Sequence, residues 1–131
     1  MSHLREFAER YTEAWCSRDA TRVAACYSEI GSLRLNDGPA AVGRRAIAEV
    51  AQSFMSAFPD MTVRMDGIAD EDGQAVYRWT LMGTNTGSGG SGRRIRISGQ
   101  EVWKMGHDGL IAESSGRFDE AEYDRQLKEG V

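Results

Sequence analysis

The chain has few of the residues from which metal and disulfide sites are built. Its 131 residues include two cysteines and two histidines, with no CxxC, HxH or HExxH spacing. Zinc sites need clusters of these ligands, so no metal site is expected. The histidines, His3 and His107, lie near the N-terminus and in a predicted turn. Cys16 and Cys26 fall on helical segments, where reduced buried thiols are expected rather than a disulfide.

Long apolar runs are also missing. The N-terminal residues pass directly into an amphipathic pattern, without a stretch of signal-peptide or membrane-span length. A cytoplasmic protein without a membrane partner is therefore expected. The glycine-rich run at residues 87–92 does not stand at a strand-to-helix turn, so it is interpreted as a flexible loop and not as a phosphate-binding motif. No organic cofactor is expected.

Neither sign of charge is strongly in excess. The chain carries 16 basic and 20 acidic residues, for a formal net charge of -4. The basic residues are dispersed, except at residues 44–45 and 93–96, which argues against a nucleic-acid partner. A hydrophobic content of 40% is enough for a core. The length predicts one domain over residues 1–131.

The first half of the chain has helical periodicity. Apolar residues recur at three- and four-residue spacing over residues 4–17 and again over 43–57, which predicts two amphipathic helices. Asp19 is placed to cap a short helix between them. Pro59 ends the later helix, because the residue before a proline is pushed out of the helical region.

From Met61 onward the period changes to two, which predicts strands. Turns are predicted at residues 70–73 and 107–109, and a short earlier strand at 31–35. A closing helix is predicted over residues 120–128. This order predicts an α+β fold: an antiparallel sheet packed on three N-terminal helices. A long twisted sheet would curl and leave a cone-shaped interior.

Asp119 stands at the junction of the last strand and the closing helix. With Glu122 three places later it matches a capping box, so a helix cap alone is one interpretation. The other is catalysis, because desolvation at the mouth of an apolar cavity raises a carboxyl pKa toward the range useful for proton transfer. The two roles are compatible. Arg117, on the same strand face, either pairs with Asp119 or points to solvent.

Glu101 interrupts an otherwise apolar strand face. A carboxylate there must be paired, protonated or at a pocket rim, unless a bulge near Gly99 turns it outward. Trp79 and Trp103 are expected to form walls of the cavity or the core. Tyr11 is expected either in the core with its hydroxyl satisfied or as a polar partner in a site.

Several motifs follow one another along nearly the whole chain: Ala57-Phe58-Pro59-Asp60, Arg78-Trp79 with Gly83-Thr84-Asn85-Thr86-Gly87, Asp108-Gly109-Leu110-Ile111-Ala112-Glu113, and Asp119 seven residues before Gln126-Leu127. Their order resembles the SnoaL-like polyketide cyclase family, within the nuclear transport factor 2-like superfamily. Cyclases of that family close a ring of an aromatic polyketide ester by intramolecular aldol chemistry without a cofactor. The resemblance implies that Asp119 is the general acid/base.

The chain departs from that family at two motifs. Asn85 stands where the family often has His, and residues 114–116 (Ser-Ser-Gly) stand where it often has His-Trp-Asp. These changes remove a polar partner and an aromatic wall. Glu101 and Tyr11 also resemble, in position, the acidic oxyanion-hole residue and the tyrosine of ketosteroid isomerases. The matching base, near residues 33–35, is missing.

The sequence thus favours a cofactor-independent aldol cyclase or isomerase that acts on a polyketide-like or other hydrophobic carbonyl compound. Asp119 is the predicted catalytic residue, and the predicted substrate-binding residues are Tyr11, Trp79, Glu101, Trp103 and Arg117. The alternative is a non-catalytic ligand-binding or assembly module of the same fold. A homodimer is expected, because in this fold a partner usually covers an outer sheet face such as the one formed by Arg94, Arg96, Gln100, Val102 and Lys104.

Overall fold

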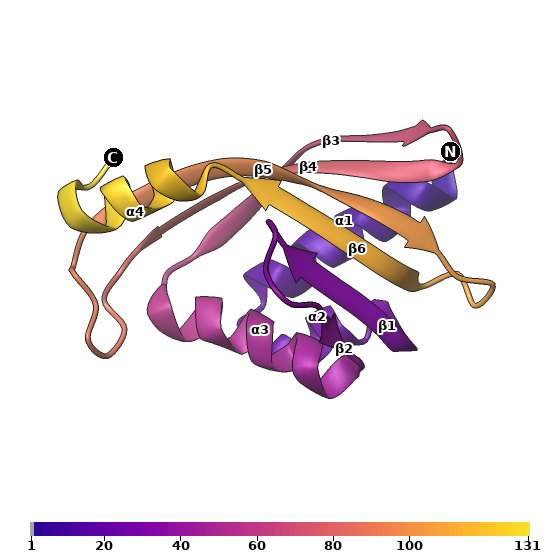
Figure 1. The fold of residues 1–131 in the computed structure, drawn as a ribbon, viewed down its shortest axis with the longest axis horizontal. Coiled ribbons are helices and arrows are strands. Elements are labelled where there is room, and N and C mark those ends of the chain that lie inside the picture. The colour runs from indigo at the N-terminus through magenta and orange to yellow at the C-terminus, as the bar shows by residue number, and fades with distance from the viewer. Residues whose placement is uncertain (1) are drawn as a thin grey trace.

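The computed structural model describes residues 2–131. Its elements are α1 (Ser2–Cys16), α2 (Ala20–Ala24), β1 (Tyr27–Leu35), β2 (Ala41–Val42), α3 (Arg44–Ala57), β3 (Thr62–Glu71), β4 (Gln74–Thr84), β5 (Arg94–Met105), β6 (Ile111–Phe118) and α4 (Glu120–Glu129) (Figure 1). The predicted α+β fold is confirmed, and β1 begins at Tyr27 rather than at residue 31. Asp19 caps α2 as predicted, because its side chain accepts the Thr21 N–H. Both cysteines are free.

The six strands form one curled sheet in the order β2-β1-β6-β5-β4-β3. Figure 1 shows the sheet passing over α1 and α3, with α4 continuing from β6 at one end. The expectation of a wholly antiparallel sheet is wrong at one pair, because β1 and β6 run parallel. The three successive hairpins from β3 to β6 bring β6 back beside β1 in the same direction.

Aromatic side chains fill the space between α1 and the inner face of the sheet. Tyr11 of α1 is fully buried, and its ring lies 5.0–6.4 Å from those of Trp15, Tyr27, Tyr77 and Trp103, measured between centroids. Tyr77 and Trp103, which come from β4 and β5, stack at 4.9 Å. Aromatic pairs of this kind add to the stability from burial alone, so they fix α1 against the centre of the sheet.

The glycine-rich loop between β4 and β5 packs closely on the end of α3. Asn85 donates to the Ala57 carbonyl at 3.1 Å and accepts the Ser91 N–H at 2.8 Å. A Cβ at Gly87 would overlap the carbonyl group of Ser56. The glycines that predicted a flexible loop therefore also permit a close approach of two backbones.

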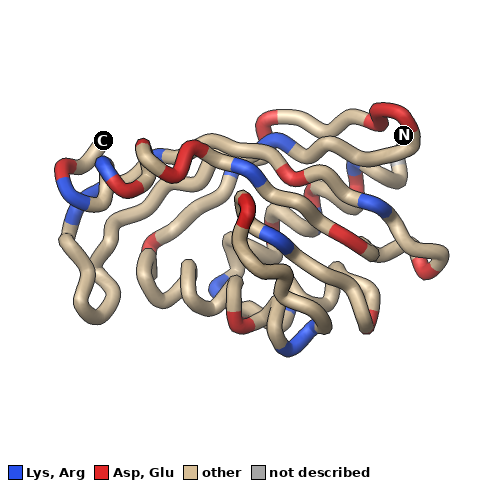
Figure 2. The backbone as a smooth tube through the Cα atoms, viewed as in Figure 1, with Lys and Arg blue, Asp and Glu red and all other residues tan. Residues whose placement is uncertain are grey.

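The outer surface carries charges of both signs. Figure 2 shows Lys and Arg interspersed with Asp and Glu over most elements, and an acidic turn at residues 70–72 between β3 and β4. On β5, the side chains of Arg94, Arg96, Gln100 and Lys104 are exposed. The homodimer expected from this face stays a prediction. Among residues 2–131, no helix is long and apolar enough to cross a membrane.

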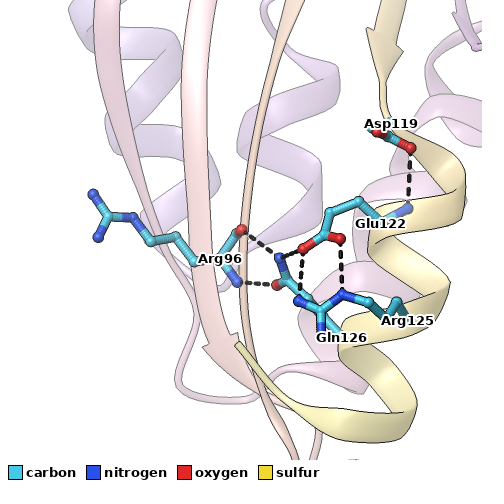
Figure 3. Close-up of polar contacts among 5 residues, drawn as sticks. All are labelled: Arg96, Asp119, Glu122, Arg125 and Gln126. Atoms are coloured by element: carbon cyan, nitrogen blue, oxygen red, sulfur yellow. Dashed lines mark hydrogen bonds and ion pairs between the residues drawn. The ribbon is translucent and has the colours of Figure 1, made fainter.

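Helix α4 is joined to β5 by Gln126, beyond the point where β6 ends. The pairing of β5 with β6 stops at Gly99 and Phe118, so the backbone of Arg96 needs another partner on that side. The buried Gln126 amide provides one: its oxygen accepts the Arg96 N–H at 2.6 Å, and its nitrogen donates to the Arg96 carbonyl at 3.1 Å (Figure 3). The side chain thus pairs with β5 as a neighbouring strand would.

Glu122 holds the Gln126 amide from within the same helix. Its carboxylate accepts from the Gln126 nitrogen at 2.7 Å and from the Arg125 guanidinium at 2.8 Å (Figure 3). The hydrogen bonds from Arg125 and then from Gln126 lower the pKa of Glu122 to about 2. Glu122 therefore stays ionised and keeps the amide turned toward β5.

We expect Gln126→Ala to destabilise the protein by roughly 1–3 kcal/mol, because a backbone N–H and a carbonyl lose their partner. Urea denaturation measures the change. Lys128→Ala, on an exposed position of the same helix, is the control and should change stability by no more than about 0.5 kcal/mol. Equal stabilities of the two variants would show that the link to Arg96 does not stabilise the fold.

Candidate functional site

An apolar cavity lies between the inner face of the sheet and helices α1, α3 and α4. The space in it that water-sized molecules can occupy is about 50 Å³, and the wider volume of about 590 Å³ includes open solvent. The predicted curled sheet therefore leaves a cavity on its inner face. Aliphatic side chains from β1, β3, β4 and β5 line part of it, and its aromatic walls are Trp15, Phe54, Tyr77, Trp79, Phe118 and Tyr123. Glu101 is the lining residue that carries a carboxyl group.

Strand alternation places Glu101 on the inner face of β5. It is 6% exposed and lies opposite Tyr77 of β4 and Gly116 of β6. The pairing of β4 with β5 has no register shift near Gly99, so the alternative of an outward-turning bulge is wrong. A Cβ at Gly116 would make an ordinary contact of 3.5 Å with the Cγ of Glu101 and a close one of 3.0 Å with Leu35, so the glycine makes room for Leu35.

The two oxygens of Glu101 have different surroundings. Oε1 accepts hydrogen bonds from the Tyr11 hydroxyl at 2.8 Å, the Trp103 indole N–H at 2.9 Å and the Ser114 hydroxyl at 3.0 Å. Within residues 2–131, Oε2 accepts no hydrogen bond. Since Glu101 lines the cavity, Oε2 is the oxygen left for a bound molecule.

The environment of Glu101 acts on its pKa in two directions. Burial raises the pKa above the usual value of 4.5, and the hydrogen bonds from Trp103, Tyr11 and Ser114 oppose this without cancelling it. Burial, with the nearby Glu101 carboxylate, also raises the pKa of Tyr11 well above 10.0. Tyr11 therefore remains a protonated donor, and Glu101 becomes a carboxyl group able to gain and lose a proton closer to neutral pH.

The predicted aromatic residues divide between the cavity and the core. Trp79 lines the cavity, and the edge of its ring lies over Gly99, where a Cβ would collide with it. Its indole nitrogen is buried without a hydrogen-bond partner in the described part of the chain. Trp103 and Tyr11 are fully buried behind the lining and bond to Glu101. They support the carboxyl group rather than form the wall.

Asp119 is an exposed cap of α4. Its Oδ1 accepts the Glu122 N–H at 3.0 Å, which confirms the predicted helix cap (Figure 3). It does not line the cavity, so the desolvation required by the catalytic hypothesis is missing in this structure. Arg117 is 62% exposed and pairs with Asp37 at 2.9 Å rather than with Asp119. The catalytic role of Asp119 and the ligand-binding role of Arg117 stay predictions.

Sequence reasoning missed Ser114 and Tyr123. Ser114 shares strand parity with Gly116 and Phe118 on β6, and this parity was the available signal that it faces inward. Tyr123 enters the lining because α4 is held against β5, and helical spacing alone does not show that contact. In residues 2–131, no group of three or more His, Cys, Asp or Glu side chains is arranged to hold a metal ion.

We expect Asp119→Ala to destabilise the protein by roughly 0.5–2 kcal/mol through loss of the cap, and Asp119→Asn to be nearly neutral, because Asn caps a helix about as well as Asp. Thermal and urea denaturation measure both. Equal losses in the two variants would mean that the carboxylate stabilises the fold by something other than the hydrogen bond to Glu122.

Glu101→Gln is expected to gain stability relative to the wild type as the pH rises. Since the pKa of Glu101 is raised in the folded protein, the stability contributed by the protonated acid is complete below about pH 4.5 and is lost as the pH rises through the folded-state pKa. Glutamine does not ionise and has no such loss. Urea denaturation across this pH range measures the difference, with the exposed Glu29→Gln as control. A difference that stays constant with pH would contradict the prediction.

Comparison with solved structures finds proteins of the same fold. A candidate SnoaL-like polyketide cyclase from Jannaschia sp. CCS1 has a TM-score of 0.84 at 14% identity, covering 99% of this chain and 94% of that one. A candidate polyketide cyclase from Xanthomonas campestris pv. campestris has 0.77 at 21%, covering 96% and 97%. A protein with a ketosteroid isomerase-like fold from Catenulispora acidiphila DSM 44928, in complex with trimethylamine, has 0.78 at 10%, covering 89% and 88%.

At these identities the structural likeness shows the fold alone. No match is found among curated proteins. The model of the SnoaL-like domain family matches residues 8–114, which is most of the chain and includes Glu101 and Ser114, whereas Asp119 lies beyond it. This match confirms the resemblance inferred from the sequence motifs, and the chain therefore belongs to the SnoaL-like domain family.

Proposed function

We propose that this protein is a cofactor-independent cyclase or isomerase that moves a proton next to a carbonyl group of a hydrophobic molecule, with Glu101 as the acid/base. The observation that carries the proposal is a buried carboxyl group that lines an aromatic-walled cavity and has one oxygen free of hydrogen bonds. Membership of the SnoaL-like family supports a small-molecule ligand. The relatives described as polyketide cyclases support a ring-closing reaction.

The proposed reaction begins with ionised Glu101. Oε2 takes a proton from the carbon beside the carbonyl: a C–H bond breaks, an O–H bond forms, and the electron pair passes into an enolate. The enolate then attacks a second carbonyl of the same molecule, which forms a carbon–carbon bond, or is reprotonated at another carbon. In the first case the new alkoxide takes up the proton, in the second the carbon does, and Glu101 returns to its ionised form.

The environment of Glu101 suits this role. A base must be strong enough to take the proton and weak enough to return it, and a pKa raised by burial brings a carboxyl group closer to that balance. The flat walls of Trp79, Phe118 and Tyr123 suit stacking against an unsaturated ring. The apolar lining limits competing reactions with water.

Non-catalytic ligand binding is the second candidate. The observation that favours it is the lining itself, which among residues 2–131 holds Glu101 but no second carboxylate, histidine or lysine to share the proton transfers. Asp119, the catalytic residue predicted from the sequence, would have to act from an exposed position on α4. Both candidates use the same cavity, so only a measurement of proton transfer separates them.

The test is proton exchange in a simple hydrophobic ketone, 2-tetralone. Deuterium incorporation from D₂O beside its carbonyl is followed by proton NMR, and binding by quenching of Trp fluorescence. The wild type is expected to accelerate exchange over buffer. Glu101→Gln should reduce the accelerated rate by about 100-fold or more, because the amide cannot take up the proton, while binding persists on the unchanged apolar and aromatic walls. Asp119→Asn should leave the rate unchanged.

Each other outcome decides between the alternatives. Loss of exchange in Asp119→Asn with full exchange in Glu101→Gln would transfer the role to Asp119. Binding of 2-tetralone without accelerated exchange in the wild type would overturn the proposed proton transfer and support the binding module.

A further inference from the structure

We infer that Ser114 is a positioning residue for Glu101: with Tyr11 and Trp103 it occupies Oε1 completely, so that the carboxyl group gains and loses its proton only at Oε2, the oxygen without these hydrogen bonds. No sequence motif pointed to this role, because Ser114 stands where the family pattern is lost. The importance of Ser114 for catalysis rests on the proposed function. The three hydrogen bonds to Oε1 do not depend on that proposal.

Three donors converge on one oxygen from three elements of the fold. Tyr11 comes from α1, Trp103 from β5 and Ser114 from β6, at 2.8, 2.9 and 3.0 Å from Oε1. A carboxylate oxygen offers about two lone-pair sites, so three donors leave Oε1 no position for a proton. While these three groups donate to Oε1, a proton bound by Glu101 lies on Oε2.

The hydrogen bonds behind Glu101 also have a defined direction. The Tyr11 hydroxyl has one proton and gives it to Oε1, so in its 2.9 Å contact with Tyr27 the Tyr27 hydroxyl must be the donor. The chain thus runs from Tyr27 to Tyr11 to Glu101, and each donor strengthens the next. This arrangement favours the ionised carboxyl group.

No other nearby group is expected to titrate together with Glu101. The ionisable side chains that face it are Tyr11 of α1, Tyr27 of β1 and Tyr77 of β4. Burial raises the pKa of each above its usual 10.0, so these phenols stay protonated while the carboxyl group titrates. From β6, Ser114 and Gly116 face Glu101 without charge.

Ser114 has a matched control next to it in the chain. Ser114 is 2% exposed and donates to Glu101, whereas Ser115 points away from the cavity and is exposed. Replacing Ser114 with alanine removes one donor to the ionised form and almost no volume. The titration of Glu101 should then move to higher pH, because burial is opposed by two hydrogen bonds instead of three.

The experiment is a carbon NMR titration of the protein labelled at the glutamate Cδ, without any ligand. The Glu101 signal is identified by its absence in Glu101→Gln. Ser114→Ala and Tyr11→Phe should each shift its midpoint to higher pH, Ser114→Thr should keep it near the wild-type value, and Ser115→Ala should leave it unchanged. A loss of stability alone would not produce this pattern.

An unchanged midpoint in Ser114→Ala would overturn the inference, as would an equal shift in Ser115→Ala. If Ser114→Ala does not fold, Tyr11→Phe removes another of the three donors to Oε1 and tests the same inference. An unchanged NMR midpoint of Glu101 in Tyr11→Phe would then overturn it. The pH profile of 2-tetralone exchange in Ser114→Ala should move with the NMR midpoint. A midpoint that shifts while the wild type shows no exchange would leave the inference standing and refute only the proposed function.

Discussion

The burial of one carboxyl group is the constraint on which the site depends. Glu101 is 6% exposed, and a charge at such depth is tolerated only with hydrogen bonds to it. Its donors come from α1, β5 and β6, so the same contacts that satisfy Glu101 hold three elements in a fixed relation. The cavity wall and its one acidic group are therefore products of the same packing.

The end of the cavity nearest α4 depends on a different polar contact. Gln126 pairs with the backbone of Arg96 where β6 no longer accompanies β5, and so places Tyr123 in the lining. Asp119 begins this helix as its cap. The C-terminal segment thus shapes the cavity through its attachment, while its own charged groups stay at the surface.

The sequence predicted the elements well, because periodicity and turn residues act locally. Strand parity also placed Glu101 and Trp79 on the inner face. Strand parity predicts the face of the sheet on which a side chain lies, but not how deeply it is buried. Trp103 shares the face of Glu101 but lies behind the lining, because Tyr77 stacks over it. Local sequence patterns also do not predict whether Asp119 lies at a cavity or in solvent, since a capping pattern is the same in both places.

The parallel pairing of β1 with β6 has a consequence for the speed of folding. β1 lies near the start of the chain and its partner near the end, so their pairing closes a loop that contains most of the chain. Contacts between such distant segments cost loop-closure entropy before they contribute stability, and they slow the folding of a domain. Since β6 also brings Ser114, the third donor to Glu101 depends on this same long-range contact.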